Sequence, residues 1–122
     1  MLQLTNEQPI LLMPELAIPF GVKGAVILLL LHQRLREQGQ RFEEKSWYCQ
    51  SYDHWYAQLP FLRKSTIKRQ LLHFEALEII QASDRFNMLY VDRTKWYTIN
   101  YEMLRVMTGI TKSELDSFVD QA

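Results

Sequence analysis

The sequence lacks most of the features that an enzyme or a secreted protein would need. Cys49 is the only cysteine among 122 residues, so no intrachain disulfide is possible, which fits a reducing cytoplasm. The four glycines are isolated from one another, which excludes a phosphate-binding glycine loop. The three histidines, His32, His54 and His73, have no second ligand at the spacing of a metal site. We therefore expect no catalytic activity, no metal and no cofactor.

An excess of charge of either sign is also absent. The chain has 14 Lys and Arg and 14 Asp and Glu, so its formal net charge is zero. A neutral chain has no overall attraction to nucleic acid or to a membrane surface, so any such binding requires a local patch. The longest apolar run, residues 25–31, is too short to span a bilayer, and no signal-like segment precedes it. We expect a cytoplasmic protein that does not enter a membrane.

Three prolines punctuate the first twenty residues and oppose regular structure there. They are Pro9, Pro14 and Pro19. Proline cannot donate a backbone hydrogen bond, so it is confined to strand edges, strand ends and irregular segments. The pattern predicts an extended N-terminal arm over residues 1–21, with at most a short strand at 10–13.

Strong helix formers follow the arm. They predict a helix over residues 22–37, which Gly39 closes. Residues 26–31 are apolar around the whole circumference, whereas a helix that lies on one core needs a single apolar stripe. We therefore expect cover on two sides, by the arm and by a second subunit, and hence a homodimer.

The remaining elements are short. Residues 41–45 form a charged connector, and strands are expected at 47–49, 79–83 and 88–99. Further helices are expected at 52–58, 65–77, 101–107 and 111–119. Two of these helices have recognisable N-terminal caps, because Ser51 precedes the first and Thr111 stands three residues before Glu114 in the last.

The order of these elements predicts a winged helix-turn-helix. The turn at residues 59–62 has the length that a helix-turn-helix uses, and a hairpin with a turn at 84–87 follows the third helix directly. The expected fold is therefore mainly α with a small antiparallel β-sheet. We assign the winged helix to residues 22–104 and a C-terminal helical extension to residues 105–122.

The third helix begins in a purely cationic segment. FLRKSTIKRQLLH, residues 61–73, contains Arg63, Lys64, Lys68 and Arg69 and no acid. The spacing of Ile67, Leu71 and Phe74 places them on the core face, so Lys68 and Arg69 point away from the core. An isolated helix with this pattern would more often present an ordinary solvated face. Beside a turn and a hairpin of the right lengths, we favour contact with DNA.

The hairpin has a weaker signal of the same kind. It carries Arg85 at the expected tip and Arg93 and Lys95 on its second strand, with Asp84 and Asp92 close by. A wing arginine can enter a narrow minor groove, but a soluble edge hairpin has similar charges. The paired tryptophans and tyrosines of the chain are expected in the core rather than in base stacking, and Trp96 is expected to hold the wing against the helices.

Several stretches resemble one family. PELA (residues 14–17), LPFLRKSTIKR (59–69) and DRTKWYTINY (92–101) are similar to the N-terminal winged-helix domain of phage and plasmid replisome organisers, initiators related to DnaD-like primosomal factors. The resemblance extends over residues 9–104. It implies binding of double-stranded DNA at an origin and places five residues on the recognition helix: Lys64, Ser65, Thr66, Lys68 and Arg69.

The sequence departs from the family pattern in three places. Arg63 stands where a serine usually caps the recognition helix, and Glu78 stands where glycine usually ends it. The chain stops at Ala122, whereas replisome organisers usually continue into a region that contacts helicase-loading proteins. We therefore expect either the DNA-binding part of such a protein or a small stand-alone relative.

Double-stranded DNA binding in replication initiation of a phage or other mobile element is the function that the sequence favours. The partners would be duplex DNA and replication proteins. Two alternatives stay open: a small transcriptional regulator that uses the same surface, and a winged-helix module for protein interaction. The second is favoured by the zero net charge and by Glu114, Asp116 and Asp120 near the end of the chain.

Overall fold

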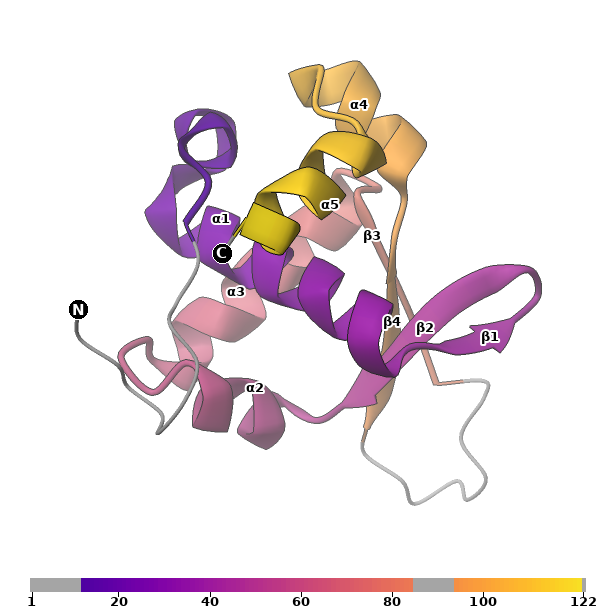
Figure 1. Cartoon of the computed structure of the whole chain (residues 1–122). Coiled ribbons are helices and arrows are strands. Elements are labelled where there is room, and N and C mark those ends of the chain that lie inside the picture. The colour runs from indigo at the N-terminus through magenta and orange to yellow at the C-terminus, as the bar shows by residue number, and fades with distance from the viewer. Residues whose placement is uncertain (1–11, 85–93, 122) are drawn as a thin grey trace.

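The computed structural model of the chain describes residues 12–84 and 94–121. Its helices are α1 (Pro14–Gln38), α2 (Tyr52–Gln58), α3 (Lys64–Ala76), α4 (Tyr101–Thr108) and α5 (Lys112–Gln121). Its strands are β1 (Gln40–Phe42), β2 (Lys45–Gln50), β3 (Ile80–Ser83) and β4 (Lys95–Ile99). The strands form one antiparallel sheet in the order β1-β2-β4-β3, and the helices gather beside it (Figure 1). The described part is thus mainly helical with a small antiparallel sheet, as expected, and its elements follow the order of a winged helix.

Helix α1 begins earlier than the prolines suggested, so the extended arm is wrong for residues 14–20. Pro14 occupies the first turn, where its missing N–H would have had no helical partner. Gly21 interrupts the helix with non-helical angles, φ 77° and ψ 165°. Because a left-handed φ suits glycine, the break falls there, and a short helical segment precedes the long one. The strand expected at 10–13 lies largely outside the described residues.

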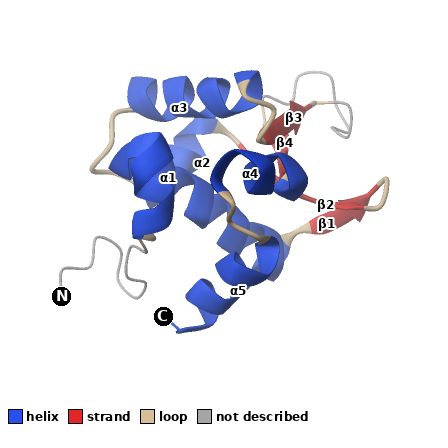
Figure 2. Cartoon of the chain, turned by 90° about the horizontal axis from the view of Figure 1, so that it is seen from above, coloured by secondary structure: helices blue, strands red, loops and turns tan. Residues whose placement is uncertain are grey.

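The apolar residues of α1 are covered by other elements of the same chain. Figures 1 and 2 show α1 between α3 and α5, and it also contacts β2 and β4. As a result, Ala25, Ile27 and Leu31 are fully buried. Two-sided cover is therefore confirmed, and α3 and α5 provide it within the described chain. The apolar run of α1 thus needs no second subunit to be buried, and the homodimer stays a prediction.

Among the described residues, α1 is the one helix whose length and composition would allow it to cross a membrane. Such a test is also passed by the core helix of a soluble domain. The apolar residues of α1 pack against α3, α5 and the sheet, which is the behaviour of a core helix. Nothing in the structure therefore favours a membrane protein.

The charged connector at residues 41–45 is a β-hairpin. β1 pairs with β2 through Phe42↔Lys45, and the two residues between them, Glu43 and Glu44, have φ of 54° and 68°. Positive φ at both positions is the geometry of a tight hairpin turn that usually uses asparagine or glycine. Glutamate is not typical of such a turn, so the sequence did not predict it. The close approach of Gly39 to Ser46 fixes the hairpin against α1, since a Cβ at position 39 would lie 2.0 Å from the Ser46 Oγ.

The second hairpin has a different register from the expected one. A four-residue turn at 84–87 would pair Ser83 with residue 88, but Ser83 pairs with Trp96. The connection between β3 and β4 is therefore longer than a tight turn. Its residues 85–93, which include Arg85 and Arg93, lie outside the described part of the chain.

Trp96 does not have the core position that we expected. Neighbouring residues of a strand face opposite sides of the sheet, and here Tyr97 is the buried one, at 1% exposure. Trp96 is half-buried on the other side, where its ring meets Phe42 edge to face at 5.1 Å between centroids. The aromatic pair of the core is Trp55 and Tyr97, whose centroids are 5.7 Å apart.

Helix α3 ends in a left-handed residue, as the departure at position 78 implied. Glu78 has φ 63°; its N–H donates to the carbonyl of Glu75, and the N–H of Ile79 donates to that of Phe74, both at 3.0 Å. This pair of bonds is the Schellman motif, in which glycine is the preferred residue at the position of Glu78. The buried side chains of Ile79 and Phe74 supply its apolar contact.

Replacing Glu78 with glycine is therefore expected to stabilise the domain by about 0.5–1 kcal/mol. The gain comes from removing the Cβ that opposes a left-handed φ. Urea denaturation of the two proteins measures it. The matched control is Glu78→Gln, which removes the charge but keeps the Cβ and should leave the midpoint unchanged. An equal gain in both variants would assign the effect to charge and contradict the conformational argument.

Candidate nucleic-acid interface

The helix-turn-helix is fixed by local bonds and by two buried leucines. The Ser51 Oγ accepts a hydrogen bond from the His54 N–H at 3.2 Å and caps α2, as expected. In the following turn, the Leu62 N–H donates to the Leu59 carbonyl at 3.0 Å. Leu59 and Leu62 are 1% and 5% exposed. Because both turn leucines are held in the core, the direction in which α3 leaves the turn is fixed.

The faces of α3 separate core from solvent. Ile67, Leu71 and Phe74 are fully buried, as the spacing predicted. Lys64, Ser65, Lys68 and Arg69 are exposed. Arg63, just before the helix, is exposed too.

Thr66 is a correction to the expected contact set. It is 8% exposed, so its side chain does not reach a ligand outside the domain. α3 packs against both α1 and α2, and two neighbours on adjacent sides bury a wider stripe than a single neighbour would. Thr66 lies next to Ile67 within that wider stripe, which the three-residue apolar spacing did not reveal.

The N-terminus of α3 has no side-chain cap. Arg63 occupies the capping position with extended angles and makes no capping hydrogen bond, in agreement with the missing serine. The first turn also contains no acid. Free N–H groups and the positive end of the helix dipole both favour a phosphate at this position. Cations in the same turn oppose the dipole, which a bound anion would offset.

One cation of α3 is already neutralised within the chain. The Lys64 Nζ lies 2.5 Å from Asp53 Oδ1 of α2, and both side chains are exposed. The hydrogen bond with Lys64 lowers the pKa of Asp53 and raises that of the lysine. An exposed pair of this kind adds little stability. Its effect on recognition is larger, because Asp53 reduces the charge that Lys64 offers to an external anion.

Tyrosines of α2 lie beneath the lysines. The Lys64 ammonium is 5.8 Å from the centroid of the Tyr56 ring, and that of Lys68 is 5.6 Å from the Tyr52 ring. Lys95 of β4 reaches the same Tyr52 ring at 5.5 Å and donates to its hydroxyl at 3.2 Å. From the sequence Tyr56 was expected in the core, and no expectation was made for Tyr52. Their i, i+4 spacing on a helix that faces α3 was the available signal for this arrangement.

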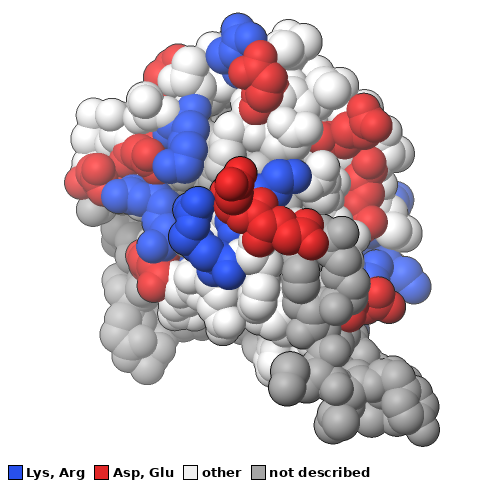
Figure 3. All heavy atoms as spheres, turned by 90° about the vertical axis from the view of Figure 1, so that its right-hand side faces the viewer, with Lys and Arg blue, Asp and Glu red and all other residues white. Residues whose placement is uncertain are grey.

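The described part of the chain contains no ion pair of Lys68, Arg69 or Lys95 with an acid. The face that carries the β1–β2 hairpin is different. Figure 3 shows Lys and Arg there intermixed with Asp and Glu, so neither sign dominates. On α3 and β4, by contrast, Lys68, Arg69 and Lys95 have no acidic partner among the described residues.

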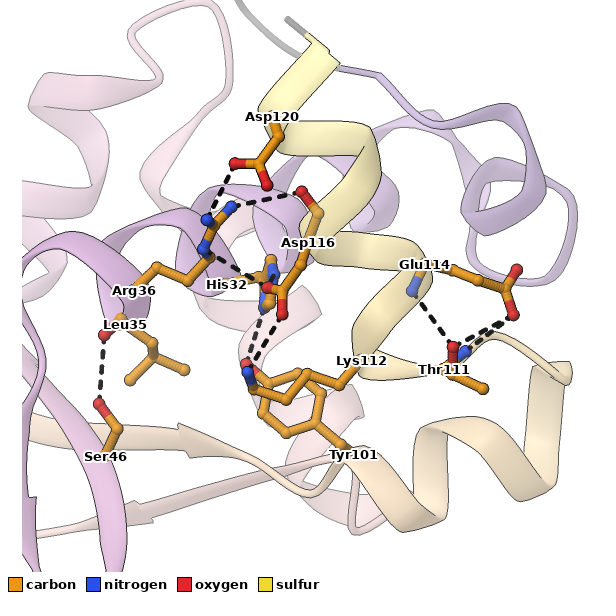
Figure 4. Close-up of polar contacts among 10 residues, drawn as sticks. All are labelled: His32, Leu35, Arg36, Ser46, Tyr101, Thr111, Lys112, Glu114, Asp116 and Asp120. Atoms are coloured by element: carbon orange, nitrogen blue, oxygen red, sulfur yellow. Dashed lines mark hydrogen bonds and ion pairs between the residues drawn. The ribbon is translucent and has the colours of Figure 1, made fainter.

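A second polar cluster joins α1, α4 and α5 (Figure 4). The buried His32 lies 2.8 Å from both the Tyr101 hydroxyl and Asp116 Oδ1. Arg36 bonds Asp120 at 2.9 Å, and Lys112 lies 3.3 Å from Asp116. These contacts fasten α5 to α1 and are internal to the domain. Within residues 12–84 and 94–121, no three His, Cys, Asp or Glu side chains are placed to hold a metal ion.

The interface thus contains Arg63, Lys64, Ser65, Lys68, Arg69 and Lys95 of the expected residues. Tyr52, Asp53 and Tyr56 are additions that only the structure reveals. No protein-family model matches the chain, and neither the curated proteins nor the solved structures include a match.

Proposed function

We propose that the chain binds double-stranded DNA in the cytoplasm, through α3 and the adjacent end of β4, and that it acts without catalysis. The observation that carries the proposal is the exposed pair Lys68 and Arg69, which follows a helix-turn-helix turn and forms no ion pair with a described acid. A neutral protein that keeps such a local patch has a surface suited to a polyanion.

The mode of binding follows from the position of the cations. Early residues of the second helix in a helix-turn-helix meet base edges, and their neighbours meet phosphates. The planar guanidinium of Arg69 matches the two acceptors of guanine in the major groove, so it is the candidate for a base contact. Lys68, a compact charge, is the candidate for a phosphate contact.

We assign this binding to replication initiation of a phage or other mobile element, together with replication proteins. The support is the resemblance of residues 59–69 and 92–101 to replisome organisers. A transcriptional regulator would use the same surface, and comparison of origin with promoter fragments separates the two roles.

The alternative of a protein-interaction module has one observation in its favour. Phe61 in the turn and Leu72 on the outer face of α3 are 48% and 45% exposed. The acidic end of the chain no longer supports it, because Asp116 and Asp120 are paired with Lys112 and Arg36. The same DNA titration separates the two classes.

The test is a fluorescence anisotropy titration of a labelled random duplex and of candidate origin duplexes at several salt concentrations. The combined substitution Lys68→Ala and Arg69→Ala removes two exposed side chains and no core atom, so the fold should persist. Binding to every duplex should weaken, and the slope of log affinity against log salt should become shallower by roughly 0.9 for each phosphate that the variant no longer neutralises. Arg69→Ala alone should also reduce sequence preference, by about 1–3 kcal/mol for the base that it contacts.

Arg105→Ala is the matched control. Arg105 is an exposed cation on α4 that pairs with Glu102, away from α3, and its removal should leave the salt slope unchanged. Absence of salt-dependent binding by the wild type would end the DNA proposal and favour the interaction module. Wild-type affinity in the double variant would move the DNA contact to another surface.

A further inference from the structure

Two lysines from different elements meet at one tyrosine ring. The ammonium of Lys68 on α3 lies 5.6 Å from the centroid of the Tyr52 ring, and that of Lys95 on β4 lies 5.5 Å from the same centroid, at the hydroxyl end of the ring. Lys95 also donates a hydrogen bond to the Tyr52 hydroxyl at 3.2 Å. The recognition helix and the wing strand therefore present their cations at a single place on the surface.

Tyr52 is held in position from below. It follows the cap residue Ser51 directly, so its backbone is fixed at the start of α2. The buried Tyr97 of β4 is its neighbour: burial is the main cause that raises the pKa of Tyr97, and a hydrogen bond with Tyr52 contributes to it. Lys95 and Tyr97, two residues apart on one strand, face the same side of the sheet. The ring is thus a fixed support on which two flexible lysines rest.

The charges of this cluster are not balanced within the described chain. Neither Lys68 nor Lys95 pairs with a described acid, in contrast to Lys64, which has Asp53. Contact with Tyr52 places each ammonium but leaves its charge available to an anion. Lys95 is half-buried, so water screens its charge incompletely. An anion at this ring would meet both positive charges at once.

We propose that Lys68 and Lys95 bind one backbone phosphate of DNA together, with Tyr52 as the residue that positions both. The proposal rests on the proposed function, and it specifies which atoms of the nucleic acid this part of the surface contacts. It also joins the helix and the wing strand at a common phosphate, which fixes the register of both on the duplex without reading a base.

A phosphate within a duplex fits this place better than free phosphate does. The cluster is open and offers two ammonium groups, whereas a site for a small free anion usually encloses it with several donors. Ser65 and Arg69, which are exposed on the same helix, would meet neighbouring parts of the same strand. Inorganic phosphate at the same ionic strength is therefore expected to compete no better than chloride.

The experiment measures salt slopes for Lys68→Ala, Lys95→Ala and the double variant on a random duplex of about 20 base pairs. If the two lysines share one phosphate, the double variant should lower the slope by about 0.9 in total. Separate phosphates would give about 1.8. Sharing also predicts that the two single effects on affinity do not add, because each variant keeps a cation at the shared phosphate.

Tyr52 variants test its positioning role. Tyr52→Phe keeps the ring beside Lys68 but removes the hydroxyl that accepts from Lys95, so it should weaken binding less than Tyr52→Leu, which removes both contacts and should weaken binding about two- to fivefold. In the Tyr52→Leu background the effects of Lys68→Ala and Lys95→Ala should become additive, a change that reduced folding stability alone would not produce. Urea denaturation confirms that each variant is folded.

Lys64, which lies at the Tyr56 ring on the same helix, supplies a matched control. Lys64→Ala should cost less affinity than Lys68→Ala, because Asp53 already neutralises Lys64, and Asp53→Asn should strengthen binding. Additive single effects with a slope change near roughly 1.8 would overturn the shared phosphate and leave the DNA function standing. Absence of wild-type binding to any duplex would instead remove the proposed function itself.

Discussion

Replacing Trp55 with alanine is expected to lower the free energy of unfolding by about 3–5 kcal/mol. Trp55 is completely buried at the junction of α2 with the sheet, and its ring meets Tyr97 edge to face. Truncation would remove a completely buried tryptophan side chain and leave a cavity that the fixed strands cannot close. Urea denaturation followed by far-ultraviolet circular dichroism measures the decrease.

Two further variants make this result interpretable. Trp96→Ala should cost roughly 1 kcal/mol, because that ring is half-buried and packs on Phe42 at the outer side of the sheet. Trp55→Phe keeps most of the volume and should fold even if the alanine variant does not. Equal decreases for Trp55→Ala and Trp96→Ala would show that the two rings contribute alike, contrary to the burial that separates them.

Replacing His32 with leucine is expected to cost about 1–3 kcal/mol, the second largest effect. In the neutral ring Nδ1 accepts from the Tyr101 hydroxyl, and the Nε2–H group faces Asp116 Oδ1 at 2.8 Å. Leucine fills the space but leaves the Tyr101 hydroxyl without its acceptor and the Asp116 carboxylate without a polar neighbour at Nε2. Because Tyr101 and Asp116 retain some contact with water, the cost should stay within this range. His32→Gln offers one acceptor and one donor and should recover part of the stability.

The same residue predicts a dependence on pH. Burial lowers the pKa of His32 below its ordinary value of 6.5, and Asp116 offsets this only in part, while Lys112 and Arg36 lower it further. As the pH falls, His32 is therefore protonated at a higher pH in the unfolded chain than in the folded chain. The contribution of neutral His32 is complete above pH 6.5 and is lost as the pH falls from there toward the folded-state pKa.

Asp116 affects stability in a different, more acidic pH range. Burial alone would raise its pKa, but Lys112 and His32 prevail and hold it below 3.8, so its contribution is lost only in stronger acid. Denaturation between about pH 7.5 and pH 5 should show stability falling in the wild type and a flatter profile in His32→Gln. An unchanged profile in His32→Gln would exclude His32 as the titrating group.

Features that depend on neighbouring residues were predicted correctly from the sequence. The cap at Ser51 and the reciprocal bonds of Thr111 and Glu114 are both present. Each is determined by a few consecutive residues, whose chemistry is visible in the sequence. The left-handed exit at Glu78 is present too, but it was implied only by the family resemblance. The apolar spacing of α3 likewise identified its buried face.

Features that depend on distant contacts were missed. Trp96 and Tyr97 are adjacent aromatic residues on one strand, so they must face opposite sides of the sheet. The sequence alone does not determine which of the two faces the core; in the structure it is Tyr97. The hairpin at Glu43 and Glu44 was hidden because packing of Ser46 on the end of α1 imposes a turn that these residues do not favour.

The same distinction applies to the interface. Lys68 and Arg69 were recognised by their distance from the apolar stripe of their own helix. The support from Tyr52 and the counterion at Asp53 were not, since both belong to α2 and are brought to the lysines only by the turn. Thr66 was wrongly included because its burial results from two helices that meet α3 from different directions.

The central place of α1 has a consequence for how the molecule comes apart. α3, α5 and the strands β2 and β4 all rest on this one helix. The contacts that hold the cationic surface and those that hold the C-terminal helix thus converge on residues 24–35 of the same element. If either region unfolded, α1 would lose packing that the other region also needs. Heat or denaturant should therefore produce a single cooperative transition. A substitution in the middle of α1 would then weaken the region of the cationic surface and the C-terminal region to the same extent.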